Sequence, residues 1–401
     1  MNILVVTDAY PPELRSSAEL MRDLAVELRK DGHKVWVITS APKDAVAGGI
    51  ALQAGISEED GVIVIRADIP QHHNVGFIKK GISWLRMPHH FWKEVKKTCR
   101  HIDAVIVHSP PLPLAKVAKY AKKKYGAKYI LNVQDIFPQN AIDLGVLKNP
   151  LLVRFFERME QRAYKECDVI VTPSYEHKEY LAKERNVRED KVHVIHHWVD
   201  PKPFAKAKNT GKFRKQFGLE DKFIFFFGGV VGPSQGLDIL IHMGKRLKKD
   251  YPNIVFLVCG DGSEKERLEN IVNRSRIENV RFEKWVSKEE YRELIKEVDV
   301  GVISLVGKNT TPAVPAKLMG YMAAGIPAIG FLHEKSEARK IIEEARCGLG
   351  TLYDDEDACL DAVVSMYKSK KKLHEYGENA LGYVEENLTP EKSIAKWEQV
   401  L

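Results

Sequence analysis

Short runs of apolar residues alternate with amphipathic helical patterns along nearly the whole chain. Residues 3–6 are rich in β-branched side chains and predict a strand, and residues 17–29 then repeat apolar positions with a helical period. Continuous apolar strands separated by helices are typical of parallel strands buried on both faces, so the pattern predicts a doubly wound α/β sheet. The next predicted strands are 35–39, 62–65, 104–107, 129–132, 169–172 and 192–195.

A second series of the same kind begins after a break near Asp200. Residues 201–210 contain two prolines and several lysines with little apolar pattern, which predicts a linker. A length of 401 residues fits two domains at roughly 100–200 residues each, so we expect domains at 1–200 and 201–379. Residues 380–401 are predicted to be helical. The strands predicted in the second series are 223–227, 254–259, 280–282, 300–304 and 328–330.

Composition and cysteine usage favour a cytoplasmic globular protein. The chain is 44% hydrophobic and 29% charged, and its five cysteines form no CxxC pair. This favours reduced thiols over a disulfide framework or a zinc site. The first residues lack the basic and apolar regions of a signal peptide, and no run reaches the roughly 18–20 apolar residues that span a bilayer.

Three features of the second half predict a diphosphate site. Two glycine-rich turns, residues 228–238 and 259–263, each follow a predicted strand, and glycine lets the backbone approach a ligand closely. The helix after such a turn favours an anion, although glycine turns are also common as plain packing. Lys317 falls in the first turn of a third helix, where a cation opposes the helix dipole. A bound phosphate would relieve that mismatch; the alternative is a solvated lysine.

These residues resemble glycosyltransferase family 4, and the resemblance spans almost the whole chain. It implies a GT-B fold, an α/β architecture of two Rossmann-like, doubly wound domains facing a cleft, with residues 380–401 packing back on the first domain. It also implies a nucleotide-sugar donor on the C-terminal domain, an acceptor on the N-terminal domain and retention of anomeric configuration. The family usually requires no metal, so no metal or other cofactor is expected. The matching segments are 10–13, 24–35, 235–238, 260–262 and 321–327.

The sequence departs from the best-known marks of that family. Many members carry two glutamates eight residues apart before the alanine-rich helix, and here those positions are Pro312 and Gly320. Many also carry an arginine and a lysine in the first glycine-rich loop, where this chain has Gly229 and Gln235. Lys317 is therefore the candidate for the missing positive charge. Residues 132–138 are similar to the branch that builds cell-surface polysaccharides, including aminosugar and fucosamine transferases.

We expect two catalytic residues, Lys317 and Asp135. Lys317 would stabilise the leaving diphosphate, and fixed donors of this kind are often the largest catalytic contribution. Trp285 and Val286 are candidates to hold the base, although Trp285 is equally compatible with a half-buried core aromatic. The donor-binding residues expected are Gly229, Gly232, Ser234, Gln235, Gly260, Asp261, Gly262, Trp285, Val286, Lys317, Leu318, Tyr321 and Glu337.

The acceptor candidates follow predicted strands of the first half. Asp135 could orient or deprotonate the acceptor hydroxyl or stabilise an oxocarbenium-like centre; alternatively it caps a helix before a proline. Arg15, Ser16 and Ser17 form the first strand-to-helix loop, and either serine could instead cap the helix. His108 is a further candidate for acceptor binding.

The positive charge is concentrated in the first half. The chain has 62 Lys+Arg and 55 Asp+Glu, a net charge of +7. Residues 77–100 hold seven Lys/Arg and one acidic residue among aromatics, and residues 116–128 add six lysines and no acid. Such segments can lie on an anionic membrane surface, which would make the protein peripheral at the inner face of the cell membrane. The alternative is an ordinary solvated helix face.

The sequence therefore predicts a glycosyltransferase (hexosyltransferase class). We expect a UDP-linked donor carrying an N-acetylated hexose, and a glycan or polyprenyl-diphosphate-linked acceptor. One alternative is a GT-B enzyme of the UDP-sugar 2-epimerase type. Another is a non-catalytic binder of anionic polymer or RNA, but the sequence holds no recognisable nucleic-acid motif, so no nucleic-acid partner is expected.

Overall fold

The chain folds into two compact units, and its C-terminal end returns to the first. The computed structural model describes residues 1–13, 15–41, 52–69, 77–307 and 310–401. Unit 1 comprises residues 1–196 and 391–401, and unit 2 comprises residues 197–390. The return therefore begins later than the predicted residue 380. Helix α15 (Lys370–Asn387) stays with unit 2, because its Gly377 lies so close to Gly325 that a Cβ would come within 2.4 Å of the Gly325 carbonyl oxygen.

Unit 1 is built on an eight-stranded sheet with the order β3-β4-β2-β1-β5-β6-β7-β8. All neighbouring strands run parallel except the edge strand β3, which pairs antiparallel with β4 and was not predicted. The chain moves outward from β1 in one direction and from β5 in the other, which is the topology of doubly wound sheets. The strands are β1 (Asn2–Val6), β2 (Lys34–Ser40), β3 (Gly55–Glu59), β4 (Val62–Ala67), β5 (Ala104–Ser109), β6 (Lys128–Val133), β7 (Val169–Thr172) and β8 (Val192–Val194).

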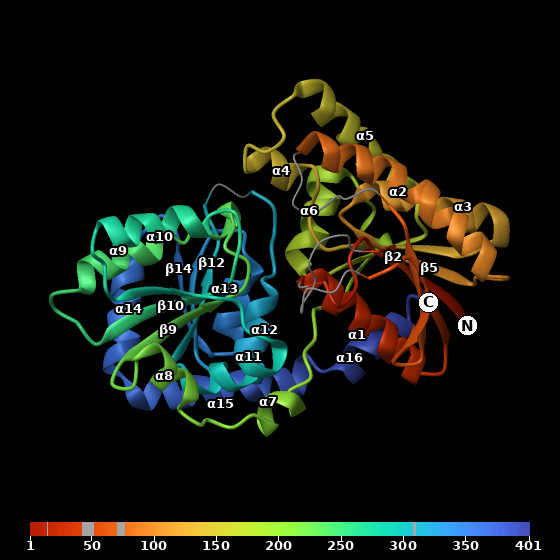
Figure 1. Ribbon diagram of the computed structural model, residues 1–401. Helices are drawn as coiled ribbons and strands as arrows, with labels where there is room; N and C mark the ends of the chain where they lie inside the picture. Colours follow the sequence, from red (N-terminus) through yellow and green to blue (C-terminus); the bar gives the residue numbers. More distant parts are fainter. Residues whose placement is uncertain (14, 42–51, 70–76, 308–309) are drawn as a thin grey trace. The chain divides into compact units, whose positions relative to one another are not determined.

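Helices flank this sheet (Figure 1). The apolar residues of β1, β5 and β6 pack with Phe91, Val117 and Phe156 of the helices in one continuous core. The helices of unit 1 are α1 (Ser16–Lys30), α2 (Phe77–Thr98), α3 (Ala115–Tyr125), α4 (Gln139–Asp143), α5 (Pro150–Glu166), α6 (Tyr175–Arg185) and the C-terminal α16 (Pro390–Glu398), with short 3-10 turns at η1 (Leu112–Leu114) and η2 (Glu189–Lys191).

Unit 2 contains a six-stranded, fully parallel sheet with the order β11-β10-β9-β12-β13-β14. This is the Rossmann order, in which the chain reverses direction between β9 and β12 and ligands bind outside the carboxyl ends of the strands at that point. The strands are β9 (Phe223–Gly228), β10 (Ile254–Cys259), β11 (Val280–Glu283), β12 (Val300–Ser304), β13 (Ala328–Leu332) and β14 (Gly348–Leu352), the last of which was not predicted.

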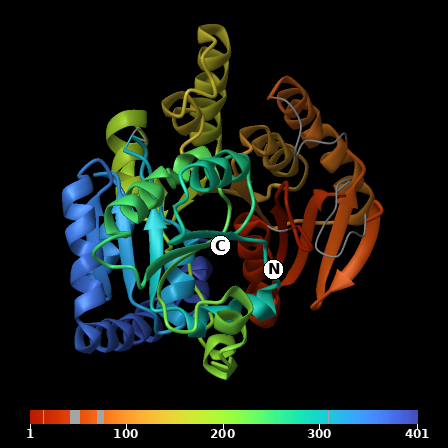
Figure 2. The same cartoon turned by 60° about the vertical axis from the view of Figure 1, so that its left-hand side comes forward.

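Helices cover both faces of the second sheet (Figures 1 and 2), and each face has its own core. Successive residues of a strand point to opposite faces. Ile224 and Phe226 accordingly pack in one core, and Phe225 and Phe227 pack in the other. The remaining helices of unit 2 are α7 (Lys202–Lys206), α8 (Lys212–Phe217), α9 (Asp238–Leu247), α10 (Lys265–Arg274), α11 (Lys288–Leu294), α12 (Ala316–Ala323), α13 (Glu337–Glu344) and α14 (Glu356–Lys368), with 3-10 turns at η3 (Pro233–Gln235) and η4 (Ile295–Glu297).

The predicted linker at 201–210 is partly helical. It contains α7, and its Phe204 is buried in the core of unit 2. The next helix, α8, is fixed by the buried carboxylate of Glu297, which accepts hydrogen bonds from the backbone N–H groups of Phe213 and Arg214 at 2.9 Å each. A single aromatic anchor and a helix-start carboxylate thus order a segment whose composition shows no apolar period.

The cysteines agree with the expectation of reduced thiols. All five are free and buried. Across the described part of the chain, none of the helices combines the length and the apolar character needed to pass through a membrane.

Candidate functional site

The predicted diphosphate-binding features lie at one edge of the unit 2 sheet. The first glycine-rich loop follows β9, the second follows β10, and Lys317 is the second residue of α12, which follows β12. Because β10, β9 and β12 are adjacent and parallel, their carboxyl ends meet at the same edge. The prediction that Lys317 lies in the first helical turn is confirmed, and the site coincides with the point where the strand order reverses.

The ammonium group of Lys317 is held over the first glycine-rich loop. Its Nζ donates a hydrogen bond to Oε1 of Gln235 at 2.7 Å and lies 4.4 Å from the ring centroid of Phe227. Its Cε lies so close to Gly229 that a Cβ at that position would be 3.6 Å away. Three elements therefore fix this cation: the end of β9, the turn η3 and the start of α12.

Lys317 is not accompanied by a carboxylate in these contacts. The side chain keeps partial access to solvent, yet protein atoms surround its ammonium group, and this loss of hydration lowers its pKa to about 7. The face of Phe227 and the amide oxygen of Gln235 compensate only part of the cost of the charge. An anion bound at this position would restore the charged form, so the site favours a negatively charged ligand.

The two glycine-rich loops pair with each other through their backbones. The N–H of Gly229 donates to the carbonyl of Cys259 at 3.0 Å, and the N–H of Val231 donates to that of Asp261 at 2.8 Å. A Cβ on Gly260 would lie 1.8 Å from the carbonyl oxygen of Gly229, and a Cβ on Gly262 would lie 2.3 Å from that of Val231. The glycines of the second loop are therefore required for packing against the first loop, whether or not they also contact a ligand.

The far end of the first loop is fixed by residues after β12 and β14. Gly236 adopts a left-handed conformation with φ of 56°, and its carbonyl accepts a hydrogen bond from the Tyr353 hydroxyl at 2.8 Å. The carbonyl of Ser234 accepts a hydrogen bond from the N–H of Val306 at 3.1 Å. Gly232, in contrast, has an ordinary extended conformation. Tyr353 was not predicted, because strand β14, which directly precedes it, was not predicted either.

Two predicted donor-binding residues of α12 lie beneath the loop. Tyr321 is fully buried, and its hydroxyl accepts a hydrogen bond from the N–H of Gly228 at 3.2 Å while lying 3.2 Å from the carbonyl oxygen of Phe226. Leu318 is also fully buried in the core. Their side chains therefore support the site from below and do not line it.

The other predicted donor-binding residues occupy separate positions in unit 2. Trp285 follows β11 and is 40% exposed, so the alternative of a half-buried core aromatic is wrong, and Val286 packs partly against the core. Asp261 is exposed and accepts a hydrogen bond from the N–H of Gly262 at 2.8 Å. Glu337 is the first residue of α13 and is 5% exposed. Their roles toward a donor stay predictions.

A pocket of about 840 Å³ also opens in unit 2 at the ends of β13 and β14. Its lining includes Arg246 and His333, but also Glu334 and four consecutive acidic residues from Asp354 to Asp357. Lys317 and the glycines of both loops are missing from its described lining. The acidic lining disfavours binding of a diphosphate in this pocket.

Three of the five acceptor candidates, Arg15, His108 and Asp135, lie in or after adjacent strands of unit 1. Arg15 follows β1, His108 lies within β5, and Asp135 follows β6. Because β1, β5 and β6 are neighbours in the sheet, the structure brings these positions to one edge, at the point where the strand order reverses. His108 is 4% exposed, whereas Asp135 is exposed.

Both helix-capping alternatives are wrong. The N-cap of α1 is Arg15, which makes no capping hydrogen bond through its side chain, and Ser16 and Ser17 are the first two residues of the helix. The side chain of Ser16 lies outside the described part of the chain. The N-cap of α4 is Pro138, so Asp135 does not cap a helix. Arg15 instead lies 3.8 Å from the carboxylate of Asp8, measured between Nη1 and Oδ2.

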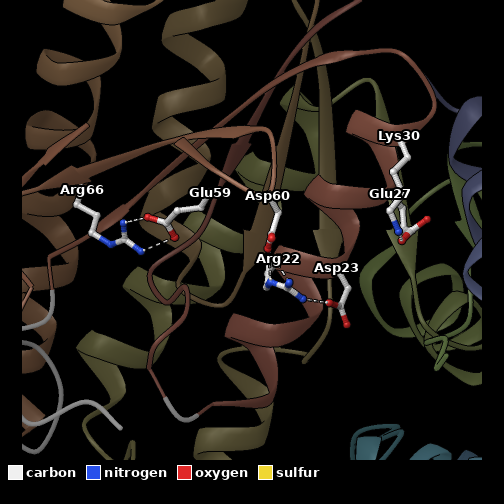
Figure 3. Close-up of polar contacts among 7 residues, drawn as sticks. All are labelled: Arg22, Asp23, Glu27, Lys30, Glu59, Asp60 and Arg66. Atoms are coloured by element: carbon white, nitrogen blue, oxygen red, sulfur yellow. Dashed lines mark hydrogen bonds and ion pairs between the residues drawn. The ribbon is translucent and has the colours of Figure 1, made fainter. Parts of the chain in front are cut away.

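The loop after β1 is anchored by a buried arginine that the sequence analysis missed. Arg66, at the end of β4, donates to the carbonyl of Pro11 at 2.7 Å and makes a bidentate ion pair with Glu59 of β3 (Figure 3). Arg22 of α1 binds Asp60 at 2.6 Å beside this pair (Figure 3). The sequence did hold a signal for this contact: Arg66 lies within an otherwise apolar strand, and a buried guanidinium group needs a partner.

Glu13 is a second residue of this loop that sequence reasoning did not single out. It is 8% exposed, and its burial raises its pKa to about 7, despite the nearby guanidinium of Arg15. A carboxyl group that exchanges a proton near neutral pH is suited to acid–base chemistry at this edge. The signal was an acidic residue in a short loop of prolines and apolar residues.

Two family descriptions match the chain, one for each unit. Residues 18–202 match Glycosyltransferase Family 4, and residues 209–382 match Glycosyl transferases group 1. Together the two matches cover most of the chain and divide it close to the boundary between the units.

Three known proteins similar to the chain align over nearly its full length. The glycosyl transferase WcaI of Escherichia coli (strain K12), named for colanic acid biosynthesis, is 23% identical and the alignment covers 99% of this chain and 98% of WcaI. Sucrose-phosphate synthase from Thermosynechococcus elongatus has a TM-score of 0.80 at 14% identity, covering 100% of this chain and 98% of the synthase. Anabaena HepE in complex with UDP-glucose has a TM-score of 0.76 at 14% identity, and the alignment covers 100% of this chain and 99% of HepE.

The two family matches, the two Rossmann-like units and the folds of the similar structures lead to one conclusion. The chain is a glycosyltransferase of the family 4 type with the GT-B fold.

Proposed function

We propose that the chain transfers an N-acetylated hexose from a UDP-linked donor to a glycan or polyprenyl-diphosphate-linked acceptor in cell-surface polysaccharide biosynthesis, with retention of anomeric configuration. The observation that carries this proposal is the Lys317 ammonium group, held by Gln235 and Phe227 beside Gly229 at the end of β9. The protein compensates the positive charge of Lys317 only in part, at the point where the strand order of the Rossmann-like sheet reverses. A cation in this position suits a diphosphate. The similarity to WcaI and to HepE bound to UDP-glucose supports the choice of pathway and base.

Lys317 would stabilise the charge that develops on the leaving diphosphate. Its position is fixed before the sugar nucleotide binds. Removal of one preorganised hydrogen-bond donor of this kind typically lowers the rate by about 10²–10³-fold. The backbone N–H groups of Gly232 and Ser234 would add further donors, whereas Pro233 has no N–H and the N–H of Gln235 donates to the carbonyl of Gly232. Since the protein supplies this positive charge, we propose that transfer requires no metal; addition of a chelator such as EDTA should leave turnover unchanged.

Unit 1 would supply the acceptor site. The positions of Arg15, His108 and Asp135 lie toward the carboxyl edge of its sheet, and Asp135 is exposed there. We assign Asp135 to orienting or deprotonating that hydroxyl. A cytoplasmic protein peripheral to the membrane would fit an acceptor linked to a lipid.

A panel of sugar nucleotides tests the donor assignment. UDP-N-acetylglucosamine and related UDP-N-acetyl sugars should raise the melting temperature of the protein, whereas GDP-, ADP- and dTDP-sugars should raise it less. A ligand at 100 times its Kd stabilises by about 2.7 kcal/mol, which corresponds to roughly 5–10 °C for a unit of this size. Absence of any shift across the panel would refute the donor site.

The anomeric outcome is tested separately. Once a donor is identified, the coupling constant of the anomeric proton in the first-formed product distinguishes retention from inversion by NMR. An inverted product would refute the proposed stereochemistry while leaving the donor site intact.

A further inference from the structure

A tyrosine hydroxyl without a protein partner lies beside the Lys317 site. Tyr291, on α11, is half-buried, and within the part of the chain that the structure describes its hydroxyl group makes no hydrogen bond. The surrounding protein atoms raise the pKa of this phenol above its usual value, so the group stays protonated at neutral pH and can both donate and accept. Tyrosine hydroxyl groups that pack into a protein normally have a partner, so this one is suited to bind a ligand.

Two glycines border this hydroxyl group. A Cβ on Gly320 of α12 would lie 3.2 Å from Oη of Tyr291, and a Cβ on Gly228 would lie 3.0 Å from its Cε2. The tyrosine ring therefore lies against the end of β9 and the middle of α12. Because neither glycine carries a side chain, no Cβ from either position covers the hydroxyl group.

The same two elements hold Lys317. Its Cε lies 3.6 Å from the place of a Cβ on Gly229, which directly follows Gly228. Lys317 and Gly320 are three residues apart in α12, so they lie on one face of the helix, about 5–6 Å apart. The tyrosine hydroxyl and the lysine side chain thus occupy adjacent positions along the start of the first glycine-rich loop.

Helix α11 holds Tyr291 in place before any ligand binds. The helix begins with a capping box, in which Ser287 accepts a hydrogen bond from the N–H of Glu290 at 3.2 Å and Glu290 accepts one from the N–H of Ser287 at 3.1 Å. The ring centroid of Tyr291 lies 6.2 Å from that of Phe226. Helices α11 and α12, both labelled in Figure 1, pack in the same core. A ligand would therefore meet a hydroxyl group whose position is already restricted, which lowers the entropic cost of binding.

The glycine at position 320 is not explained by the backbone. It is the fifth of the eight residues of α12, where glycine is less stable than alanine, and its φ is not positive. The three nearest atoms that a Cβ would meet there all belong to Tyr291. A side chain at this position would therefore obstruct one group in particular, the Tyr291 hydroxyl.

The order of groups in a sugar nucleotide decides which part of it would reach Tyr291. A diphosphate on Lys317 has the transferred sugar on one side and the ribose and base on the other. Trp285 and Val286, the candidates to hold the base, directly precede α11, and Val286 packs against the same core as Tyr291. The ribose joins the base to the diphosphate, so it would lie at Tyr291. Its 2′- and 3′-hydroxyl groups donate and accept hydrogen bonds and match a phenol.

We propose that Tyr291 binds the ribose of the donor nucleotide through its hydroxyl group, and that Gly320 gives the ribose access to it. This assignment rests on the proposed function, because it takes the donor to be a nucleoside-diphosphate sugar. It adds a selectivity for ribonucleotides over their deoxy analogues, since a deoxy analogue would leave the Tyr291 hydroxyl without its partner.

Isothermal titration calorimetry of the full chain with UDP and 2′,3′-dideoxy-UDP, at one fixed pH, tests the proposal. Tyr291→Phe, which removes only the hydroxyl oxygen, should raise the Kd for UDP about fivefold. Wild type should prefer UDP to the dideoxy analogue, and this preference should fall about fivefold in Tyr291→Phe, because the combination of the two changes isolates their mutual contact. Gly320→Leu, which fills the space before the hydroxyl with a good helix former, should weaken UDP binding more than Tyr291→Phe does.

Tyr367 supplies a matched control in the same unit. Its ring centroid lies 5.3 Å from that of Phe223, at the opposite, amino end of β9. Tyr367→Phe should therefore bind UDP and the dideoxy analogue as wild type does. The melting temperatures of the ligand-free variants check that each of them folds.

Two results would overturn the proposal. An equal preference for UDP over its dideoxy analogue in wild type and Tyr291→Phe would show that the hydroxyl group does not contact the ribose. Weaker binding of UDP-N-acetylglucosamine, but not of UDP, by Tyr291→Phe would assign the hydroxyl group to the transferred sugar instead. Both results leave UDP binding by wild type intact, whereas absence of that binding would refute the donor site itself and this proposal with it.

Discussion

The pH dependence of donor binding should reveal the charge state of Lys317. With a pKa of about 7, its amine is mostly protonated below pH 7 and mostly neutral above it. A bound diphosphate raises that pKa by stabilising the ammonium form. Binding above pH 7 must therefore supply a proton to the amine, whereas binding below pH 7 finds it already charged.

The expected magnitude follows from this linkage. Each pH unit above 7 adds about 1.4 kcal/mol to the cost of charging Lys317, which weakens donor binding about tenfold. The Kd for a UDP-sugar should thus be flat below pH 7 and should rise by about tenfold between pH 7.5 and 8.5. The Kd should stop rising above the pKa that Lys317 has in the complex with the UDP-sugar.

Isothermal titration calorimetry with a UDP-sugar is the assay, because its doubly esterified diphosphate does not itself titrate near neutrality. Lys317→Arg is the matched control: its guanidinium stays protonated over this range, so its Kd should be independent of pH. Lys317→Met should bind weakly at every pH, with no slope.

A Kd for wild type that stays constant from pH 6 to 8.5 would refute the assignment of a titrating lysine to the donor. The same slope in wild type and Lys317→Met would show that another group titrates. Tight binding by Lys317→Met would remove Lys317 from the site altogether.

Four further expectations concern stability and loop geometry. Lys317→Met should stabilise unit 2 by about 2 kcal/mol below pH 7 in thermal denaturation, because the lowered pKa of Lys317 means that its charged form disfavours folding. This gain in stability should vanish as the pH approaches 10, where the lysine loses its charge in the unfolded chain as well. Glu160 of α5 is fully buried and binds the partly buried guanidinium of Arg185 at 3.0 Å, so Glu160→Ala should destabilise unit 1 by about 3 kcal/mol in urea because Arg185 loses its carboxylate; an unchanged midpoint would contradict this. Gly260→Ala should weaken UDP-sugar binding by displacing the first loop, whereas Gly382→Ala, with open space at its Cβ, should not. Arg66→Lys should raise the acceptor KM in transfer assays more than the donor KM, because a lysine cannot bind Glu59 and the Pro11 carbonyl together.

The buried strands could be predicted from the sequence because their apolar runs are continuous. The predicted ends of most parallel strands agree with the structure to within a residue or two. The positions of the site loops along the chain followed from those strand ends. Strand β3 could not be found, since its residues are largely exposed and polar, and it forms through backbone pairing with β4 and the ion pair between Glu59 and Arg66. Strand β14 is rich in glycine and only partly buried, which removes the apolar signal.

The site could be predicted at the level of loops but not of contacts. Lys317 was placed correctly at a helix start because its position in the helical pattern is local information. Its bond to Gln235 depends on how β9 and β12 lie together, which no local pattern encodes. The same applies to Gly260, whose requirement arises from the backbone of the first loop and not from its own neighbours.

The return of the last residues to unit 1 makes unit 2 a continuous insertion within the other unit's sequence. Residues 197–390 form one uninterrupted stretch, while unit 1 is assembled from both sides of it and joined through His33 to Glu398 and Lys128 to Leu401. A gene segment encoding this stretch could be exchanged between homologous enzymes as a cassette. Such a swap would pair a new sugar-nucleotide preference with an unaltered acceptor half, and only two junctions would need to be designed.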